Sequence, residues 1–287
     1  MIIPTVIDAG RDYVTVGGCG NFSVYKTFDC GQAFRFDPVD GDTSKFSGIA
    51  HGKRVIFEQT GEGQIKIHGA NEEDYCDLWA HYLALDEDYD LADSTILGAM
   101  PNDADRLVMS EAVRCGAGIR ILRQDPFEAL ISFIISQNNN IPRIKKIITA
   151  LCDKYGVDGA FPTAEALYNA GEEGLFALKT GFRAGYIHDA AKKILSGEVS
   201  LSEIDNCDDY DRATEMLCKI KGVGPKVSSC VLLFGFGKTE AFPIDVWIRR
   251  SLEKHFPNGF DPSPMGKYAG IAQQYLFYYE RWLGGGE

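Results

Sequence analysis

Lys226 and Asp245 are the two side chains best suited to covalent chemistry. Lys226 follows Gly-Val-Gly-Pro, where a helix is expected to begin, and Asp245 follows Pro243, where another helix could begin. The positive end of a helix disfavours an ammonium group, which makes a lysine there a candidate nucleophile in its amine form. A carboxylate at a helix start can cap the helix and stay ionised. The pair suits displacement at a sugar C1′: Lys226 would form the C1′–N bond, and Asp245 would stabilise oxocarbenium-like positive charge.

The segment around Lys226 predicts two helices joined by a tight turn. From Leu217 to Cys230 it has the sequence LCKIKGVGPKVSSC. Gly222 and Gly224 allow positive φ and a close approach of a ligand to the backbone. Amides at the start of the second helix carry partial positive charge and suit a backbone phosphate. Taken alone, the pattern also fits an ordinary helical hairpin with a glycine turn.

The charge of the chain is compatible with a local nucleic-acid face only. The 287 residues have a formal net charge of −12, so no basic character extends over the whole chain. Residues 1–100 hold 17 acidic and seven basic side chains, whereas the charges of the rest nearly balance. A basic face is therefore possible behind the acidic front.

Membrane spans, metals and cofactors are not predicted. No run approaches the ~20 apolar residues of a membrane span, and no secretory signal pattern opens the sequence. The eight cysteines contain no C-x-x-C pair and no run of four near the C-terminus, which argues against zinc and an iron–sulfur cluster. None of the five histidines lies four residues from another. We expect free thiols in a reducing cytoplasm.

The elements that must position these residues change from strands to helices along the chain. Residues 1–103 predict a β-rich domain, and residues 104–287 predict a larger all-α domain, hence the α+β class. Expected strands cover residues 13–16, 21–25, 54–59 and 64–68, the last two as a hairpin, and residues 71–93 fit a helix with one buried face. One further helix is expected to begin at Pro142. The other expected helices cover residues 126–137, 163–169, 184–195, 210–220, 225–234 and 264–282.

The glycine hairpin, Lys226 and the Pro-x-Asp of Pro243–Asp245 resemble the helix-hairpin-helix DNA glycosylase superfamily, and within it the 8-oxoguanine DNA glycosylase family. The resemblance extends from about Asp29 to Phe277. It implies an N-terminal antiparallel sheet domain packed on two helical subdomains, with the active site in the cleft between them. It also implies a bifunctional glycosylase and abasic-site lyase, in which Lys226 and Asp245 are catalytic and strand nicking follows base excision by β-elimination.

The resemblance further implies a pocket for a flipped base. Gly31, in CGQAFR, would present its carbonyl to the N7–H that oxidation gives guanine, where normal guanine presents a lone pair. Gln273, in AQQYLF, would hydrogen-bond the Watson–Crick edge. Phe277 would stack on one face of the base, and Cys230 would cover the other.

DNA contacts outside the pocket are implied in the same way. Asn138, in SQNNNIPR, would fill the gap left by the flipped nucleotide, and Arg143 would donate to the estranged cytosine. Phe182, beside Arg183, would wedge between base pairs where the family usually has tyrosine. Trp247 stands where the family commonly has a histidine near a phosphate. These two departures suggest a bacterial or archaeal branch. In such a cell the expected location is the cytoplasm, at the nucleoid through DNA.

The expected partner is therefore double-stranded DNA with 8-oxoguanine opposite cytosine, bound by a monomer without membrane or cofactor. A glycosylase for alkylated or oxidised pyrimidine bases is one alternative; Lys226 and the missing cysteine run argue against it. A non-catalytic DNA-binding module is another, but it has no use for Lys226 with Asp245. The least favoured alternative is an unrelated helical enzyme.

Overall fold

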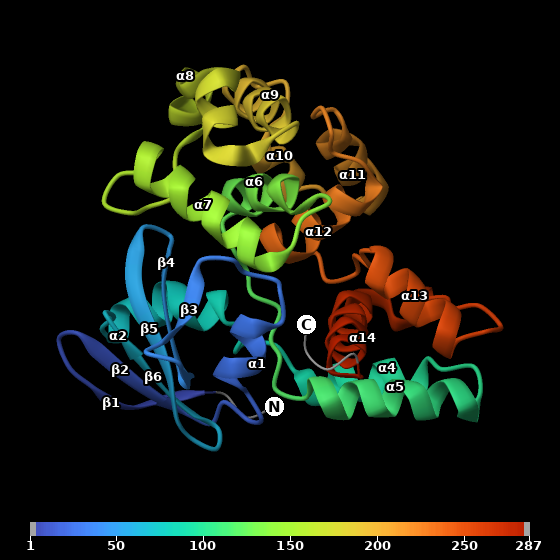
Figure 1. The fold of residues 1–287 in the computed structure, drawn as a ribbon. Coiled ribbons are helices and arrows are strands. Elements are labelled where there is room, and N and C mark those ends of the chain that lie inside the picture. The colour runs from blue at the N-terminus through green and yellow to red at the C-terminus, as the bar shows by residue number, and fades with distance from the viewer. Residues whose placement is uncertain (1–3, 284–287) are drawn as a thin grey trace.

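The computed structural model describes residues 4–283, except for the side chain of Trp282. Figure 1 shows the strands gathered in one part of the molecule and most helices in the other. The α+β class predicted from the sequence is confirmed. Buried apolar side chains form two clusters, one between the sheet and its helices and a larger one among the later helices.

The sheet is antiparallel, with the strand order β1-β2-β6-β5-β4-β3. Its strands are β1 (Thr5–Ala9), β2 (Tyr13–Gly17), β3 (Phe36–Val39), β4 (Asp42–Ala50), β5 (Lys53–Gly61) and β6 (Gln64–His68). The predicted hairpin is confirmed, since β5 pairs with β6. Alternate residues such as Phe57, Ile65 and Ile67 are fully buried, as expected for a sheet with one covered face.

Two expectations for this region are wrong. The strand expected at residues 21–25 is a turn that leads into α1 (Val24–Asp29), because the Ser23 hydroxyl caps the helix by accepting from the Lys26 amide. The helix expected over residues 71–93 is interrupted. Its first part comprises α2 (Glu72–Asp74), a π-helical turn and α3 (Ala80–Tyr82), and Asp88 then caps a new helix.

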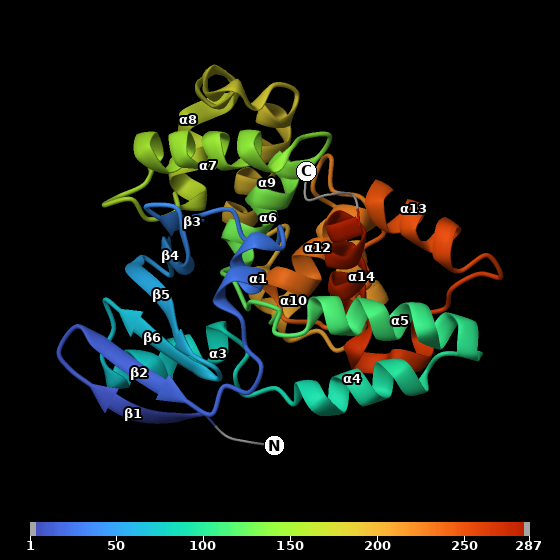
Figure 2. The same ribbon diagram turned by 60° about the horizontal axis from the view of Figure 1, so that its bottom comes forward.

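The later helices form two groups in both views (Figures 1 and 2). One group contains α4 (Tyr89–Gly98), α5 (Asp103–Gly116), α13 (Val246–His255) and α14 (Ala269–Leu283). The other contains α6 (Pro126–Ser136), α7 (Ile141–Tyr155), α8 (Ala164–Leu175), α9 (Arg183–Leu195), α10 (Leu201–Asp205), α11 (Tyr210–Cys218) and α12 (Pro225–Gly235). The boundary after residue 103 stays a prediction; α4, which precedes it, packs with α5 and α14.

The predicted helices are largely confirmed, with one interruption. The stretch expected as a single helix over 264–282 begins as a 3₁₀ turn, and α14 starts only at Ala269. Gly266 adopts a φ of +55° inside the 3₁₀ stretch Ser263–Tyr268, which breaks the regular helical path.

The turn between α11 and α12 uses its two glycines differently. Gly222 has a φ of +80°, and a Cβ there would lie 2.2 Å from the Tyr186 ring. Gly224 does not use the positive φ that glycine allows, because it is the N-cap of α12 in extended backbone with a φ of −113°. A Cβ at Gly224 would meet no atom within 4 Å. Only Gly222 is therefore required by the fold as a glycine.

A buried ion pair joins the sheet side to the helices. Arg35 donates to Glu128 at 3.0 Å, close to the start of α6, and also to the Gly159 carbonyl. Burial raises the pKa of Glu128 to about 7, although the Arg35 charge opposes this shift. The pair fixes the segment that follows Gly31 against α6.

We predict that Glu128→Gln flattens the dependence of stability on pH. The pKa of Glu128 is about 7 in the fold against an ordinary 4.5, so its favourable contribution is full below pH 4.5. This contribution is lost as the pH rises to about 7. Between these limits the wild type should lose about 3 kcal/mol more unfolding free energy than the variant. Urea unfolding at both pH values measures the difference, and equal losses would contradict the assignment.

The two hairpin glycines give a matched pair of substitutions. Gly222→Ala should lower the free energy of unfolding by about 2 kcal/mol or more, because it combines left-handed backbone with a ring clash. Gly224→Ala should lower it by less than about 1 kcal/mol, the difference between glycine and alanine at an N-cap. Urea unfolding of both variants measures the two effects. Equal losses would show that the turn does not depend on Gly222.

Candidate active site

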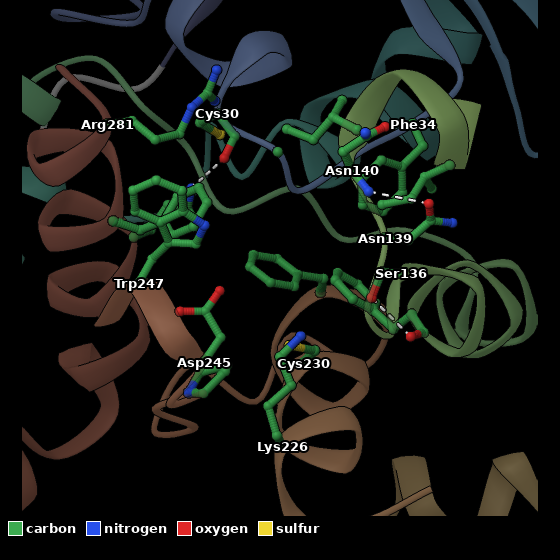
Figure 3. Close-up of a pocket in the computed structure, with 18 of the residues that line it drawn as sticks. Cys30, Phe34, Ser136, Asn139, Asn140, Lys226, Cys230, Asp245, Trp247 and Arg281 are labelled. Atoms are coloured by element: carbon green, nitrogen blue, oxygen red, sulfur yellow. Dashed lines mark hydrogen bonds between the residues drawn. The ribbon is translucent and has the colours of Figure 1, made fainter. Parts of the chain in front are cut away.

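A cavity of about 500 Å³ lies between the two helix groups. Its walls come from α6, α12, α14, the start of α13, the turn before α7 and the segment at residues 29–34. Figure 3 shows side chains from these elements converging on the space. The volume lies in the range of pockets that bind small molecules or single bases.

The structure brings Lys226 and Asp245 to this one cavity (Figure 3). Lys226 is the second residue of α12, and Asp245 is the N-cap of α13, as the sequence predicts. The Asp245 carboxylate accepts a hydrogen bond of 2.8 Å from the Ile248 amide. The bond satisfies one of the amides at the helix start that have no partner within the helix.

The surroundings of Lys226 leave its amine available to a ligand. The side chain is half-buried, and its Nζ lies 5.8 Å from the centroid of the Phe133 ring. Lys226 forms no ion pair with any described residue. The first turn of α12 carries no acidic residue, so the partial positive charge of the helix start is not neutralised there.

The expected base-recognition residues also line the cavity. Gly31, on the segment after α1, faces the space with Phe277 of α14: a Cβ on Gly31 would lie 3.5 Å from the Phe277 ring. Cys230 lies on α12, one turn after Lys226. Burial raises the pKa of the Cys230 thiol, and the charge of Lys226 opposes the shift. A neutral thiol presents a soft, apolar surface to a bound group.

Gln273 carries an unpaired acceptor at the cavity. The residue is 5% exposed, and its Oε1 atom is buried with no hydrogen-bond partner among the described residues. An unpaired buried acceptor costs about 1–3 kcal/mol, so such groups are uncommon in folded proteins. A ligand with an N–H donor would satisfy Gln273.

Three of the residues expected to contact DNA lie outside the cavity. Asn138 is exposed in the turn before α7 and adopts a φ of +48°. Phe182, just before α9, is 56% exposed. Arg143 is exposed on α7, and its guanidinium donates to the Lys179 carbonyl at 3.5 Å.

Arg183, which follows Phe182 in the motif expected to contact DNA, is buried in the structure. It is 3% exposed, and its guanidinium donates to the carbonyls of Gln137, Asn138 and Thr180. In this conformation Arg183 holds the turn that carries Asn138 and is covered from solvent. The sequence motif alone could not show that Arg183 is buried while its neighbour Phe182 is exposed.

Trp247 lines the cavity beside Asp245, within an exposed apolar patch. The side chain of Trp247 is 44% exposed, and those of Ile244 and Val246 are 43% and 61% exposed. The patch lies at the junction between the α12 hairpin and α13. Trp247 can therefore offer stacking and one N–H donor at the mouth of the cavity.

Sequence patterns missed several residues of the site. Phe133 approaches Lys226 from α6, and Asp29, Gln274 and Arg281 also line the cavity. Gln274 lies inside the AQQYLF motif, next to Gln273, but an adjacent glutamine carries no distinguishing signal in the sequence. Among residues 4–283, no cluster of three His, Cys, Asp or Glu could hold a metal. Over the same range no helix is long and apolar enough to cross a membrane.

Comparison with known proteins gives two family matches. Residues 18–130 match the family described as "8-oxoguanine DNA glycosylase, N-terminal domain". Residues 131–267 match the "HhH-GPD superfamily base excision DNA repair protein" family. The two matches meet within α6, so they divide the chain at a different place from the boundary predicted after residue 103.

Similar proteins carry consistent names. A "Probable N-glycosylase/DNA lyase" of Methanothermobacter thermautotrophicus is 34% identical over 60% of this chain and 67% of its own length. An "N-glycosylase/DNA lyase" of Saccharomyces cerevisiae is 38% identical over 48% of this chain, which spans only 42% of that relative.

A solved structure extends the likeness over almost the whole chain. The Clostridium acetobutylicum 8-oxoguanine glycosylase/lyase, solved with DNA containing cytosine opposite 8-oxoG, is 36% identical with a TM-score of 0.88. The match covers 99% of this chain and 100% of that one. On the strength of this full-length likeness and the two family matches, the chain belongs to the 8-oxoguanine DNA glycosylase family and is an enzyme of base excision DNA repair.

Proposed function

We propose that the chain removes 8-oxoguanine from duplex DNA through an imine on Lys226 and then nicks the strand. The observation that carries the proposal is the content of one cavity. An amine with no ion-pair partner among the described residues, a capped carboxylate and the unpaired Gln273 acceptor all line it. An ordinary helical hairpin would need none of these together.

The base would be recognised by its Watson–Crick edge, by its two faces and by the N7–H group that oxidation creates. Gln273 would accept from the N–H groups of the guanine Watson–Crick edge, which satisfies its buried oxygen. Phe277 and the neutral Cys230 thiol would cover the two faces. The Gly31 carbonyl would accept from N7–H, a donor that 8-oxoguanine has and guanine lacks.

Lys226 and Asp245 would then perform the bond exchange. The neutral Lys226 amine attacks C1′, the C1′–N9 bond breaks, and the base leaves with the bonding electrons and takes up a proton. The Asp245 carboxylate stabilises the positive charge that develops on the sugar. The amine loses its proton, and the sugar opens to an imine on Lys226. Loss of a proton from C2′ then expels the 3′-phosphate, and water releases the lysine.

The surrounding surface suits a distorted duplex bound by a single copy of the chain. Arg143 would donate to the cytosine left without its partner, while Asn138 and Phe182 occupy and wedge the opened stack. The α12 start, with Gly222 and Gly224, would hold a backbone phosphate through amides. We propose a monomer, because a damaged base pair is asymmetric and needs one active site.

Lys226→Gln should abolish both base release and strand nicking. We expect the single-turnover rate to fall by a factor on the order of 10⁴ or more, because the covalent nucleophile is lost. Borohydride, which reduces a lysine imine to a stable link, should trap wild-type protein on an 8-oxoguanine duplex but not the variant. Asp245→Asn should lower the rate about 10²- to 10³-fold with little change in DNA affinity.

Lys267→Gln is the matched control for the trapping experiment. Lys267 is exposed and pairs with Glu87 outside the cavity, so this variant should trap like the wild type. Base release without a trapped complex in the wild type would assign the attack to water. A Lys226→Gln protein that still trapped would move the nucleophile to another amine.

Arg143→Gln should weaken the preference for cytosine opposite the lesion. A guanidinium with paired donors contributes roughly 1–3 kcal/mol of base discrimination. We therefore expect the ratio of excision rates opposite cytosine and adenine to fall about tenfold or more in the variant. Single-turnover assays with each of the four opposite bases measure this ratio. An unchanged ratio would show that another residue selects the opposite base.

A further inference from the structure

Two side chains of α14 hold the backbone just before Gly31. The Gln274 amide donates to the Cys30 carbonyl at 2.9 Å, a bond drawn as a dashed line at Cys30 in Figure 3. The Arg281 guanidinium donates to the Asp29 carbonyl at 2.7 Å. These contacts link residues about 250 positions apart in the sequence. The two peptide planes that lead into Gly31 are therefore anchored to α14.

The backbone just after Gly31 is held from another side. The side-chain amide of Gln124 donates to the backbone carbonyl of Gln32 at 2.8 Å. The Gln32 side chain is itself 1% exposed, accepts from the Leu122 amide and donates to the Arg120 carbonyl. The chain leaving Gly31 is thus fixed to the segment that precedes α6.

Between these anchors, the Gly31 carbonyl has no hydrogen-bond partner among the described residues. Gly31 has a φ of +81° and no side chain to restrict rotation about its backbone bonds. With the flanking carbonyls free, the peptide after Gly31 could turn away from the cavity. With Cys30 and Gln32 anchored, the direction of this one carbonyl is determined by its neighbours.

We propose that Gln274 and Arg281 are positioning residues that set the selectivity for the oxidised base by fixing the Gly31 carbonyl. The inference rests on the proposed function, in which this carbonyl accepts from N7–H. It adds to that function the two residues that orient the Gly31 carbonyl, the group that would recognise oxidation.

The arrangement gives α14 two tasks on one face. Gln273 and Phe277 line the cavity from this helix, and Gln274 and Arg281 lie beside them at helical spacing. The side chains that would hold the base and the side chains that hold the backbone before Gly31 are therefore carried by one helix, α14.

The test compares 8-oxoguanine with 8-oxo-7-deazaguanine, which keeps the 8-oxo group but has a carbon, which is no hydrogen-bond donor, in place of N7–H. Single-turnover excision rates on duplexes with cytosine opposite give a selectivity ratio for each protein. Gln274→Met keeps the approximate side-chain length and removes the donor. Arg281→Met removes the guanidinium donors at a partly exposed site, with a shorter side chain. In both, we expect the ratio to fall about five- to tenfold, the contribution of one well-aligned hydrogen bond. Arg281→Lys, which keeps a donor, should restore most of it.

Tyr275→Phe is the matched control on the same helix. It removes a buried hydrogen bond of 3.0 Å to Asp93, away from the Gly31 segment, and should reduce stability without changing the ratio. If Gln274→Met and Arg281→Met excise 8-oxoguanine with the wild-type selectivity ratio, this inference is overturned and the proposed function is not. If Gln274→Met does not fold, the two Arg281 variants decide the question. A wild type without activity on 8-oxoguanine would instead overturn the proposed function, and this inference with it.

Discussion

The hydrogen bond from the Ile248 amide to the Asp245 carboxylate fixes one half of the candidate active site. It places a carboxylate at the start of α13, while Lys226 occupies the start of α12 in the other helix group. The two helices are connected only by residues 236–245, so their relative position depends on packing. α12 is held to α6 by contacts such as the stacked rings of Phe133 and Phe234, and α13 is held to α14. A change in either contact would separate the amine from the carboxylate.

The same use of helix starts explains how a chain of net charge −12 can suit a DNA partner. Backbone amides at a helix start attract phosphate without any basic side chain. The start of α12 is capped only by Gly224, with no carboxylate in its first turn to compete with a phosphate. Arg183, a basic residue of the expected contact region, is used internally to hold the Asn138 turn. Oriented dipoles therefore add positive potential at this surface to that of exposed side chains such as Arg143.

Local signals made much of this structure predictable, and long-range contacts account for the rest. Pro126, Pro142 and Asp245 mark helix starts because the preference of each acts within one turn of its own chain. The strand expected at residues 21–25 failed because one Ser23 hydroxyl stabilises a helix there. The burial of Arg183 and the bond from Gln274 to Cys30 depend on segments that meet only in the folded chain. No sequence window contains that information.

In the proposed complex, recognition divides between two acceptors that have no partner among residues 4–283. Gln273 Oε1 requires a donor, and guanine and 8-oxoguanine both supply one at the Watson–Crick edge. Gln273 therefore selects a guanine-type edge but cannot detect oxidation. The Gly31 carbonyl requires a donor that only the oxidised base supplies, and normal guanine would leave it facing a lone pair. The free protein already carries both unpaired acceptors, and only 8-oxoguanine supplies a hydrogen-bond donor to each of them. Selectivity for the oxidised base therefore depends on how firmly the Gly31 carbonyl is held in place.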